Sequence, residues 1–262
     1  MPLPPSARAK FQTYNEDWFE TTSRLPNGSV DLVLCDPPYG TTACSWDTII
    51  SPYAMWPELL RVCKANAAIV LMGNQPFTSI LICSNLELFR YCWGWNKIQP
   101  TGFLDAKRRP LRVMEDICVF YRKLPTYNPQ MWSGKPMNRK PDKGGYYLQQ
   151  LGRQQPDSFK QIHIKGKTER YPINLLEVST GRSPYKKLKH PTQKPTELMK
   201  YLVLTYSNSG ETVLDFAMGS GTTGVACGLT NRNFIGCDND VDHGYYKLAV
   251  ERITEAYNTR KH

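Results

Sequence analysis

The sequence predicts an α/β fold, a mostly parallel sheet with helices on both faces, interrupted by one inserted basic lobe. Short apolar runs alternate along most of the chain with segments of helical periodicity, the pattern of strands and helices wound into a parallel sheet. One apolar run leads to Asp36, and another leads to a glycine-rich turn, Gly219-Ser220-Gly221. Between about residues 125 and 189 the pattern fades, so we expect the insertion there.

The elements before the insertion follow from apolar spacing. Val30 to Cys35 is a nearly continuous apolar run, as in a buried strand, and Met55, Leu59 and Cys63 recur at helical spacing. We expect a strand near the start of 11–20, a strand at 30–35, a helix at 52–64, a strand at 67–72, a helix at 75–84, and strands at 91–99 and 115–121.

The elements after the insertion repeat the alternation. Leu198, Tyr201, Leu202 and Thr205 recur at helical spacing. We expect a helix at 197–206, a strand at 212–215, a helix from about 222 and a strand at 233–238. The 262 residues suffice for one sizeable domain with an inserted lobe.

Composition narrows the class of protein. The first residues hold no apolar signal-peptide core, and no run approaches the ~20 apolar residues of a membrane span, so we expect a soluble, cytoplasmic protein. The eight cysteines are scattered without a Cys-x-x-Cys pair. They are interpreted as reduced core residues, and no metal site is expected.

The positive charge belongs to one segment. Residues 122–189 hold 15 Lys or Arg against 4 Asp or Glu, a surplus of 11, whereas the whole chain has a net charge of +10. The remainder is therefore nearly neutral. Aromatic residues are interleaved with these charges, which is typical of a nucleic-acid surface, although a solvated basic loop would look similar. A second basic stretch, 102–112, is expected to be a loop.

Asp36-Pro37-Pro38-Tyr39 follows the first buried strand and forms a stiff polar loop. The prolines have fixed φ and no N–H, so their carbonyls are held as acceptors and Asp36 is pushed toward an extended conformation. An ionised Asp36 accepts hydrogen bonds, and Tyr39 offers a ring for stacking. Together they suit the exocyclic amine of a planar base. A plain proline-rich turn is the alternative interpretation.

The glycine turn and Asp238 suit a nucleoside cofactor. Glycines allow a sharp turn and close approach of the backbone to a ligand, and the following helix offers free N–H groups. Asp238 ends a strand about 20 residues further on, the distance at which a carboxylate binds ribose hydroxyls. An ordinary helix cap is the alternative role for Asp238.

The two motifs together, Asp36-Pro37-Pro38-Tyr39 and Asp215-Phe216-Ala217-Met218-Gly219-Ser220-Gly221-Thr222-Thr223-Gly224, resemble those of the amino-methyltransferases that modify adenine or cytosine in DNA using S-adenosylmethionine. The catalytic motif precedes the cofactor motif, as in the permuted beta-type order of that family. The resemblance implies the Rossmann-like methyltransferase fold. It also implies a catalytic half at 1–124, a DNA target-recognition region at 125–189 and a cofactor-binding half at 190–262.

The resemblance assigns roles to individual residues. It makes Asp36, Pro37, Pro38 and Tyr39 the catalytic loop. The cofactor would be contacted by Asp17, Lys194, Thr196, Asp215, Phe216, Gly219, Ser220, Gly221, Thr222 and Asp238. Helix capping is the alternative for Asp17, and a proline-capped helix entry the alternative for Lys194 and Thr196. DNA contacts are expected from the basic residues Lys107, Arg108, Arg109, Arg139, Lys140, Lys186 and Lys187.

Two positions depart from the family pattern. Met114 stands beside Glu115 where the subgroup commonly has a histidine, so no imidazole is expected there. Phe216 follows Asp215 directly, whereas the aromatic residue commonly stands two places after the acid.

The expected reaction is methyl transfer from S-adenosylmethionine to the N6 amine of adenine in double-stranded DNA, with base flipping. Asp before Pro-Pro-Tyr is typical of the adenine enzymes and Ser of the cytosine-N4 enzymes, which remain the nearest alternative. RNA is another candidate acceptor. From other classes, a nicotinamide oxidoreductase would use the glycine turn but leaves the Asp36 loop unexplained, and a non-enzymatic DNA-binding module explains neither motif. A second copy of the chain is a candidate partner, because dimers are frequent in the family.

Overall fold

The computed structural model describes residues 9–40, 49–139, 164–181, 193–240 and 244–259. The chain divides into two compact units: a main unit, Met1–Asn128 with Ile173–His262, and an inserted unit, Pro129–Pro172. The main unit contains an eight-stranded sheet with its helices, and the inserted unit contains a two-stranded sheet. Among the described residues, no helix is long and apolar enough to cross a bilayer.

The sheet of the main unit is mostly parallel, as the sequence predicts. Among its described strands, the antiparallel pairs are those that β5 makes with β3 and β4. Across the sheet the strands lie in the order β1 (Phe11–Tyr14), β10 (Asn233–Cys237), β9 (Thr212–Asp215), β2 (Val30–Cys35), β3 (Cys63–Gly73), β5 (Arg112–Phe120), β4 (Phe89–Thr101) and β8 (Leu175–Glu177).

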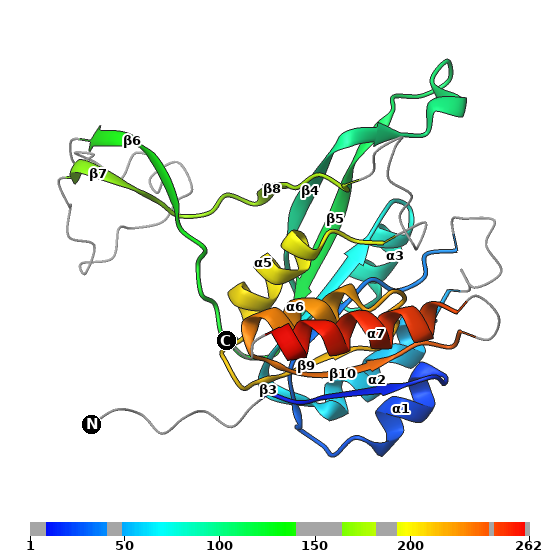
Figure 1. Cartoon of the computed structure of the whole chain (residues 1–262). Helices are drawn as coiled ribbons and strands as arrows, with labels where there is room; N and C mark the ends of the chain where they lie inside the picture. The colour runs from blue at the N-terminus through cyan, green and yellow to red at the C-terminus, as the bar shows by residue number, and fades with distance from the viewer. Residues whose placement is uncertain (1–8, 41–48, 140–163, 182–192, 241–243, 260–262) are drawn as a thin grey trace, which may run out of the picture. The chain divides into compact units, whose positions relative to one another are not determined.

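Helices cover both faces of the sheet, which gives three layers (Figure 1). One face carries α1 (Trp18–Arg24), α2 (Pro52–Val62) and α3 (Phe77–Ser84), and the other α5 (Thr196–Tyr206), α6 (Thr222–Thr230) and α7 (Tyr245–Asn258). On the first face Val33 and Ile69 pack with Leu59. On the second face Leu34 and Val70 pack with Leu202. The central strands are apolar on both faces because both faces are buried.

The strand order reverses between β9 and β2. From β9 the chain passes through α6 to β10 on one side, whereas from β2 it passes through α2 to β3 on the other side. Ligands of open α/β sheets bind at such a switch point, in the crevice at the carboxyl ends of the strands. Asp215 ends β9 there, and Asp36 follows β2 there.

The hairpin formed by β4 and β5 extends beyond the same edge of the sheet (Figure 1). The last residue of β3, Gly73, pairs with Asp116, but β4 and β5 continue to pair as far as Thr101 and Arg112. Four further residues of β5 correspond to about 14 Å at ~3.4 Å per residue. The connection between the two strands begins with a short 3₁₀ turn, Phe103–Asp105.

The inserted unit holds a hairpin of its own. Its strands β6 (Trp132–Arg139) and β7 (Ile164–Arg170) are antiparallel. Strand β8, which lies within the range expected for the inserted lobe, instead belongs to the main sheet, where it pairs in parallel with β4. Its Leu176 is buried in the core there, which accounts for the return of the chain to the sheet before residue 189.

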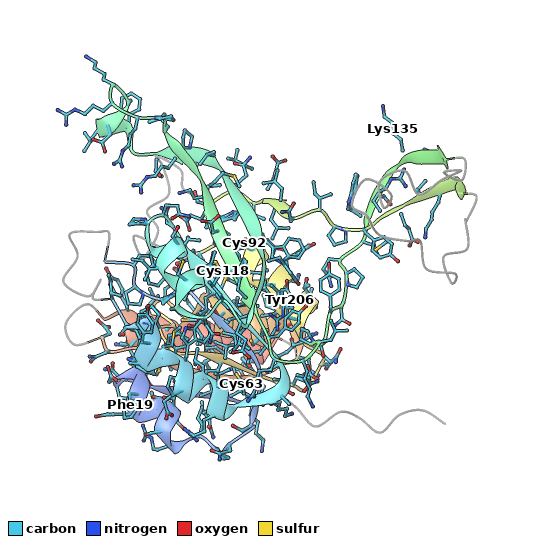
Figure 2. All side chains as sticks on the ribbon, turned by 180° about the vertical axis from the view of Figure 1, so that it is seen from behind. Phe19, Cys63, Cys92, Cys118, Lys135 and Tyr206 are labelled. Carbon is cyan, nitrogen blue, oxygen red and sulfur yellow. The ribbon has the colours of Figure 1, made fainter. Side chains whose placement is uncertain are left out.

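The seven cysteines in the described parts of the chain are free thiols, and five of them are buried. Figure 2 shows Cys92 and Cys118 side by side on β4 and β5. They are directly opposite in the strand register, with their Sγ atoms 3.6 Å apart. Cys83 is exposed, so the core position expected of all the cysteines is wrong for this one.

Candidate active site

The four residues of the Asp36 loop lie at the carboxyl edge of the sheet. The Tyr39 hydroxyl donates a hydrogen bond to Oδ1 of Asp36, so the loop closes on itself. The Tyr39 ring packs on Phe77 of α3, with ring centroids 5.2 Å apart. Pro37 is buried, and Asp36, Pro38 and Tyr39 are partly buried. The fixed φ of the two prolines and these contacts hold Asp36 at the switch point.

Asp36 stands at one end of a series of four charged side chains, each in contact with the next. Lys194 Nζ lies 2.9 Å from Asp36 Oδ2 and 3.1 Å from Glu115 Oε2. The other oxygen of Glu115, Oε1, lies 3.1 Å from Lys97 Nζ. The side chains of Lys97, Glu115 and Lys194 are only 7%, 13% and 11% exposed. We call Asp36, Lys194, Glu115 and Lys97 the charge chain.

Burial and pairing set the ionisation of the charge chain. Burial raises the pKa of Asp36, and the Lys194 ammonium offsets part of that rise. Burial would lower the pKa of Lys194, but the Asp36 and Glu115 carboxylates outweigh it, so this pKa is raised. Burial would raise the pKa of Glu115, but Lys194 and Lys97 hold it below its usual value. With all four groups ionised, two positive and two negative charges balance, as buried charges require.

Sequence reasoning did not assign Lys97 and Glu115 to the site. Lys97 follows Trp93 and Trp95 on the inward face of β4, and a lysine that continues an apolar period-2 stripe is a signal that could have identified it. Glu115 is directly opposite Trp95 in the strand register. Their meeting depends on the pairing of β4 with β5, which no local pattern specifies.

The glycine turn has the backbone conformation expected of it. Gly219 and Gly221 have φ of +50° and +73°. A Cβ on Gly221 would stand 2.9 Å from the Ala249 Cβ of α7 and 3.1 Å from its Cα, so the turn packs too closely for a side chain. Arg252 of α7 donates hydrogen bonds to the Ser220 carbonyl and to the Thr222 hydroxyl. Packing and hydrogen bonds from α7 therefore hold the turn in place.

Two acids flank the glycine turn, Asp215, which is buried, and Asp238, which is partly buried. Asp238 follows β10, and its Oδ2 accepts the Gly219 N–H at 2.7 Å. Burial raises the pKa of Asp238, and the bond from Gly219 opposes this. Asp215 accepts the Ala217 N–H at 3.3 Å, and its burial raises the pKa to about 7. Burial and the neighbouring Asp215 also raise the pKa of the Cys35 thiol, which links the β9 end to the residue before Asp36.

The remaining predicted cofactor residues lie around this edge in different roles. Asp17 caps α1 by accepting the Phe19 N–H at 2.8 Å, which is the alternative role that the sequence allowed it. Phe216 is buried on the α1 side, with its ring centroid 6.2 Å from that of Trp18. Thr196 begins α5, directly after Pro195 at the N-cap. Lys194 lies in the charge chain, beside Asp36. Cofactor contacts of these residues stay predictions.

The residues predicted to bind DNA are only partly described. Lys107, Arg108 and Arg109 are exposed where β4 connects to β5. Arg109 pairs with Asp105. Arg139 ends β6 of the inserted unit. Lys140, Lys186 and Lys187 lie outside the described residues.

Two curated relatives are similar to the chain over most of its length. The Type II methyltransferase M2.LlaDCHI of Lactococcus lactis subsp. cremoris is 39% identical over 270 residues, covering 91% of this chain and 87% of that protein. The DNA adenine methyltransferase YhdJ of Escherichia coli (strain K12) is 26% identical over 249 residues, covering 89% of this chain and 79% of that protein.

Solved structures share the fold. The M1.HpyAVI–SAM complex aligns with a TM-score of 0.61 at 23% identity, covering 93% of this chain and 98% of that one. The cytosine-N4-specific PvuII DNA methyltransferase aligns with a TM-score of 0.60 at 16% identity, covering 95% and 92%. The family model described as DNA methylase matches residues 30–251, which span both the Asp36 loop and the glycine turn. The chain therefore belongs to the N6/N4 DNA methylase family.

Proposed function

We propose that this chain transfers a methyl group from S-adenosylmethionine to the exocyclic N6 amine of adenine in double-stranded DNA. The observation that carries the proposal is the Asp36 carboxylate, held at the switch point beside the glycine turn. Family membership supports a DNA methyltransferase, and the relative named as a DNA adenine methyltransferase supports the choice of base.

The Asp36 loop activates the amine by orientation. The lone pair of an exocyclic amine is delocalised into the ring, so the amine is a poor nucleophile. Asp36 and the Pro37 carbonyl each accept one amine hydrogen, which localises the lone pair and aims it. A carboxylate has about four acceptor positions, so the contacts of Asp36 with Tyr39 and Lys194 leave capacity for the amine.

The proton balance also involves Asp36. Attack of the amine nitrogen forms the new N–C bond and breaks the S–C bond of the sulfonium, and the nitrogen then loses one proton. Burial raises the pKa of Asp36, which makes its carboxylate a better acceptor for that proton. The side chain is 25% exposed, so the proton can leave to solvent.

The glycine turn and Asp238 fit the adenosyl part of the cofactor. The turn presents the start of α6 without side chains at Gly219 and Gly221, and Asp238 brings a carboxylate to the same turn. S-adenosylmethionine supplies the electrophilic methyl group. The M1.HpyAVI structure supports this choice, because that protein was solved as a complex with the same cofactor.

The target adenine reaches Asp36 by leaving the duplex. An amine inside stacked DNA is out of reach of a carboxylate that is only 25% exposed, so the base is flipped, and the Tyr39 ring stacks on it. The inserted unit supplies target recognition. It carries the basic residues Lys135, Lys167 and Arg170 on an antiparallel hairpin.

A cytosine-N4 acceptor is the second candidate, favoured by the likeness to the PvuII enzyme. Both amines present the same edge to a carboxylate and a carbonyl. Asp36 stands where the cytosine enzymes typically carry serine, which favours adenine.

The test is expression in cells whose DNA carries no base methylation, with Asp36→Ala as the matched control. The DNA and RNA are digested to nucleosides, and the methylated nucleosides are identified by mass spectrometry. The DNA is also sequenced with detection of modified bases. We expect N6-methyladenine in one sequence context with the wild type and none with Asp36→Ala. Finding N4-methylcytosine would show that cytosine, not adenine, is the methylated base. Finding the methyl group in RNA would show that RNA is the substrate. An active Asp36→Ala variant would refute the role of Asp36.

A further inference from the structure

We propose that Lys194 is a positioning residue for methyl transfer: its ammonium keeps the Asp36 carboxylate ionised and aimed, and Glu115 holds Lys194 in place. The proposal rests on the proposed function, because it concerns the carboxylate assigned to the amine. The position of Lys194 before α5 suggests a contact with the cofactor. We assign Lys194 instead to the Asp36 carboxylate.

The geometry places Lys194 between two carboxylates. Its Nζ is 2.9 Å from Asp36 and 3.1 Å from Glu115, so one ammonium bridges the end of β2 to β5. Two aromatic rings lie near it, because Nζ is 5.6 Å from the centroid of Tyr39 and 5.8 Å from that of Trp95. The Lys194 side chain is 11% exposed, so water screens these interactions little.

The charges around Asp36 show why the lysine matters. Asp36 is faced by Lys194 from the segment before α5, by Glu115 from β5, by Tyr39 from its own loop, and by Cys35 and Asp215 from the ends of β2 and β9. Lys194 is the cation among these described groups. Burial and Glu115 both raise the pKa of Asp36, so without Lys194 the carboxyl would hold its proton to a higher pH. A protonated Asp36 would accept the amine hydrogens poorly.

Glu115 is itself held from the far side. Lys97 contacts its other oxygen and the Thr101 hydroxyl. Directly after Lys97, Ile98 has φ of +66°, which is unfavourable for a β-branched residue, and its N–H is held by Oδ1 of Asn96. The register of β4 against β5 shifts at the same place, between Asn96 and Thr101. The β4 irregularity therefore coincides with the point at which Lys97 joins the charge chain.

The test compares Lys194→Met with the conservative Lys194→Arg. Lys64→Met is the matched control, because Lys64 pairs with Asp31 at the opposite end of β2. Three quantities are measured: the pH dependence of the single-turnover methylation rate, the pKa of the Asp36 carboxyl by carbon NMR, and S-adenosylmethionine affinity by calorimetry. The NMR titration needs no activity, so it tests the pairing even if the proposed function fails.

We expect Lys194→Met to raise the pKa of Asp36 and to move the acid limb of the rate profile to higher pH. At a pH below that limb, the rate should fall about tenfold for each pH unit by which the limb moves, while cofactor affinity stays within about twofold. In Lys194→Arg the acid limb should lie close to its wild-type pH, because the positive charge is kept. Weakened cofactor binding with an unmoved limb would assign Lys194 to the cofactor and overturn the proposal, as would a variant unchanged in all three measurements.

Glu115→Gln tests the second half of the proposal. Because Glu115 acts through Lys194, a chain carrying both Glu115→Gln and Lys194→Met should be no slower than Lys194→Met alone. Rate losses that multiply would mean that Glu115 acts independently of Lys194. If Lys194→Met does not fold, the neutral, polar variant Lys194→Gln replaces it in the same comparison.

Discussion

Asp238 joins the end of β10 to the glycine turn. Its Oδ2 accepts the Gly219 N–H, and its own N–H donates to the Tyr14 carbonyl at the end of β1. One carboxylate therefore shapes the turn, and we propose that it also binds the ribose of the cofactor. The two roles can be separated by substitution, because an asparagine can still accept the bond from Gly219 through its amide oxygen.

We predict that Asp238→Ala weakens S-adenosylmethionine binding by about 1 to 3 kcal/mol, the usual cost of removing a hydrogen-bonding partner from a buried polar group. Asp238→Asn should weaken S-adenosylmethionine binding less than Asp238→Ala does, because asparagine keeps the hydrogen bond from Gly219 but loses the negative charge. Calorimetry on both variants measures the effect, with Asp31→Asn at the start of β2 as the control. Unchanged affinity in Asp238→Ala would remove Asp238 from the cofactor site.

Local sequence patterns predicted the parts of the site that follow single strands. Asp36 and Asp238 each end an apolar run, and parallel strands bring their carboxyl ends to one edge. The role of Lys194 could not be predicted in this way. It depends on Glu115, whose position is set by long-range pairing of β5 with β3 and β4, and on a register shift that places Lys97. The sequence likewise gives no local signal for β8, which is recognisable as a strand of the main sheet only by its pairing with β4.

The β4–β5 hairpin extends from the carboxyl edge of the sheet, where the candidate active site lies. Figure 1 shows it reaching beyond the helical layers. The 3₁₀ turn is held by backbone bonds from Asp105 to Gly102 and from Arg108 to Asp105. Phe103 and Leu104 are 81% and 103% exposed, so these apolar side chains lie in solvent next to the basic residues. An ordered basic projection at the catalytic edge suits contact with DNA phosphates.

We predict that charge reversal at the connection, Lys107→Glu with Arg108→Glu, weakens binding to all DNA sequences alike. Each lost phosphate contact should also flatten the plot of log affinity against log salt concentration by about 0.9. Fluorescence anisotropy across a salt series measures both effects. Arg90→Glu, at the opposite end of β4, is the matched control. A double variant with the affinity and salt slope of the wild type would exclude the hairpin from DNA binding.

At the scale of the whole molecule, the chemistry and the choice of DNA sequence are assigned to different units. The main unit contains the Asp36 loop, the charge chain and the glycine turn. The inserted unit begins at Pro129, directly after Asn128, whose N–H and side chain bind carbonyls at the end of α5. The main unit thus anchors the chain where the inserted unit departs.

We predict that replacing residues 129–172 with a short glycine-serine linker keeps S-adenosylmethionine affinity within about twofold of the wild type. Methylation of the preferred site should fall about a thousandfold or more, toward the level of non-specific DNA. Calorimetry and methylation mapping on the same preparation test this. Methylation of the same sites at the same rate would show that recognition resides elsewhere.

The position of β9 between β10 and β2 also fixes when the active site can assemble during synthesis. Asp31 of β2 accepts the Thr212 N–H across 181 residues of sequence. Translation adds about 5 to 20 residues per second, so β9 is synthesised roughly ten to thirty-five seconds after β2. During that interval β2 is an open edge strand, and Leu32 lacks the residues of α5 and α6 that later cover its face of the sheet. The Asp36 carboxylate is thus among the first parts of the candidate site to be made, and β9 and Lys194 beside it are among the last.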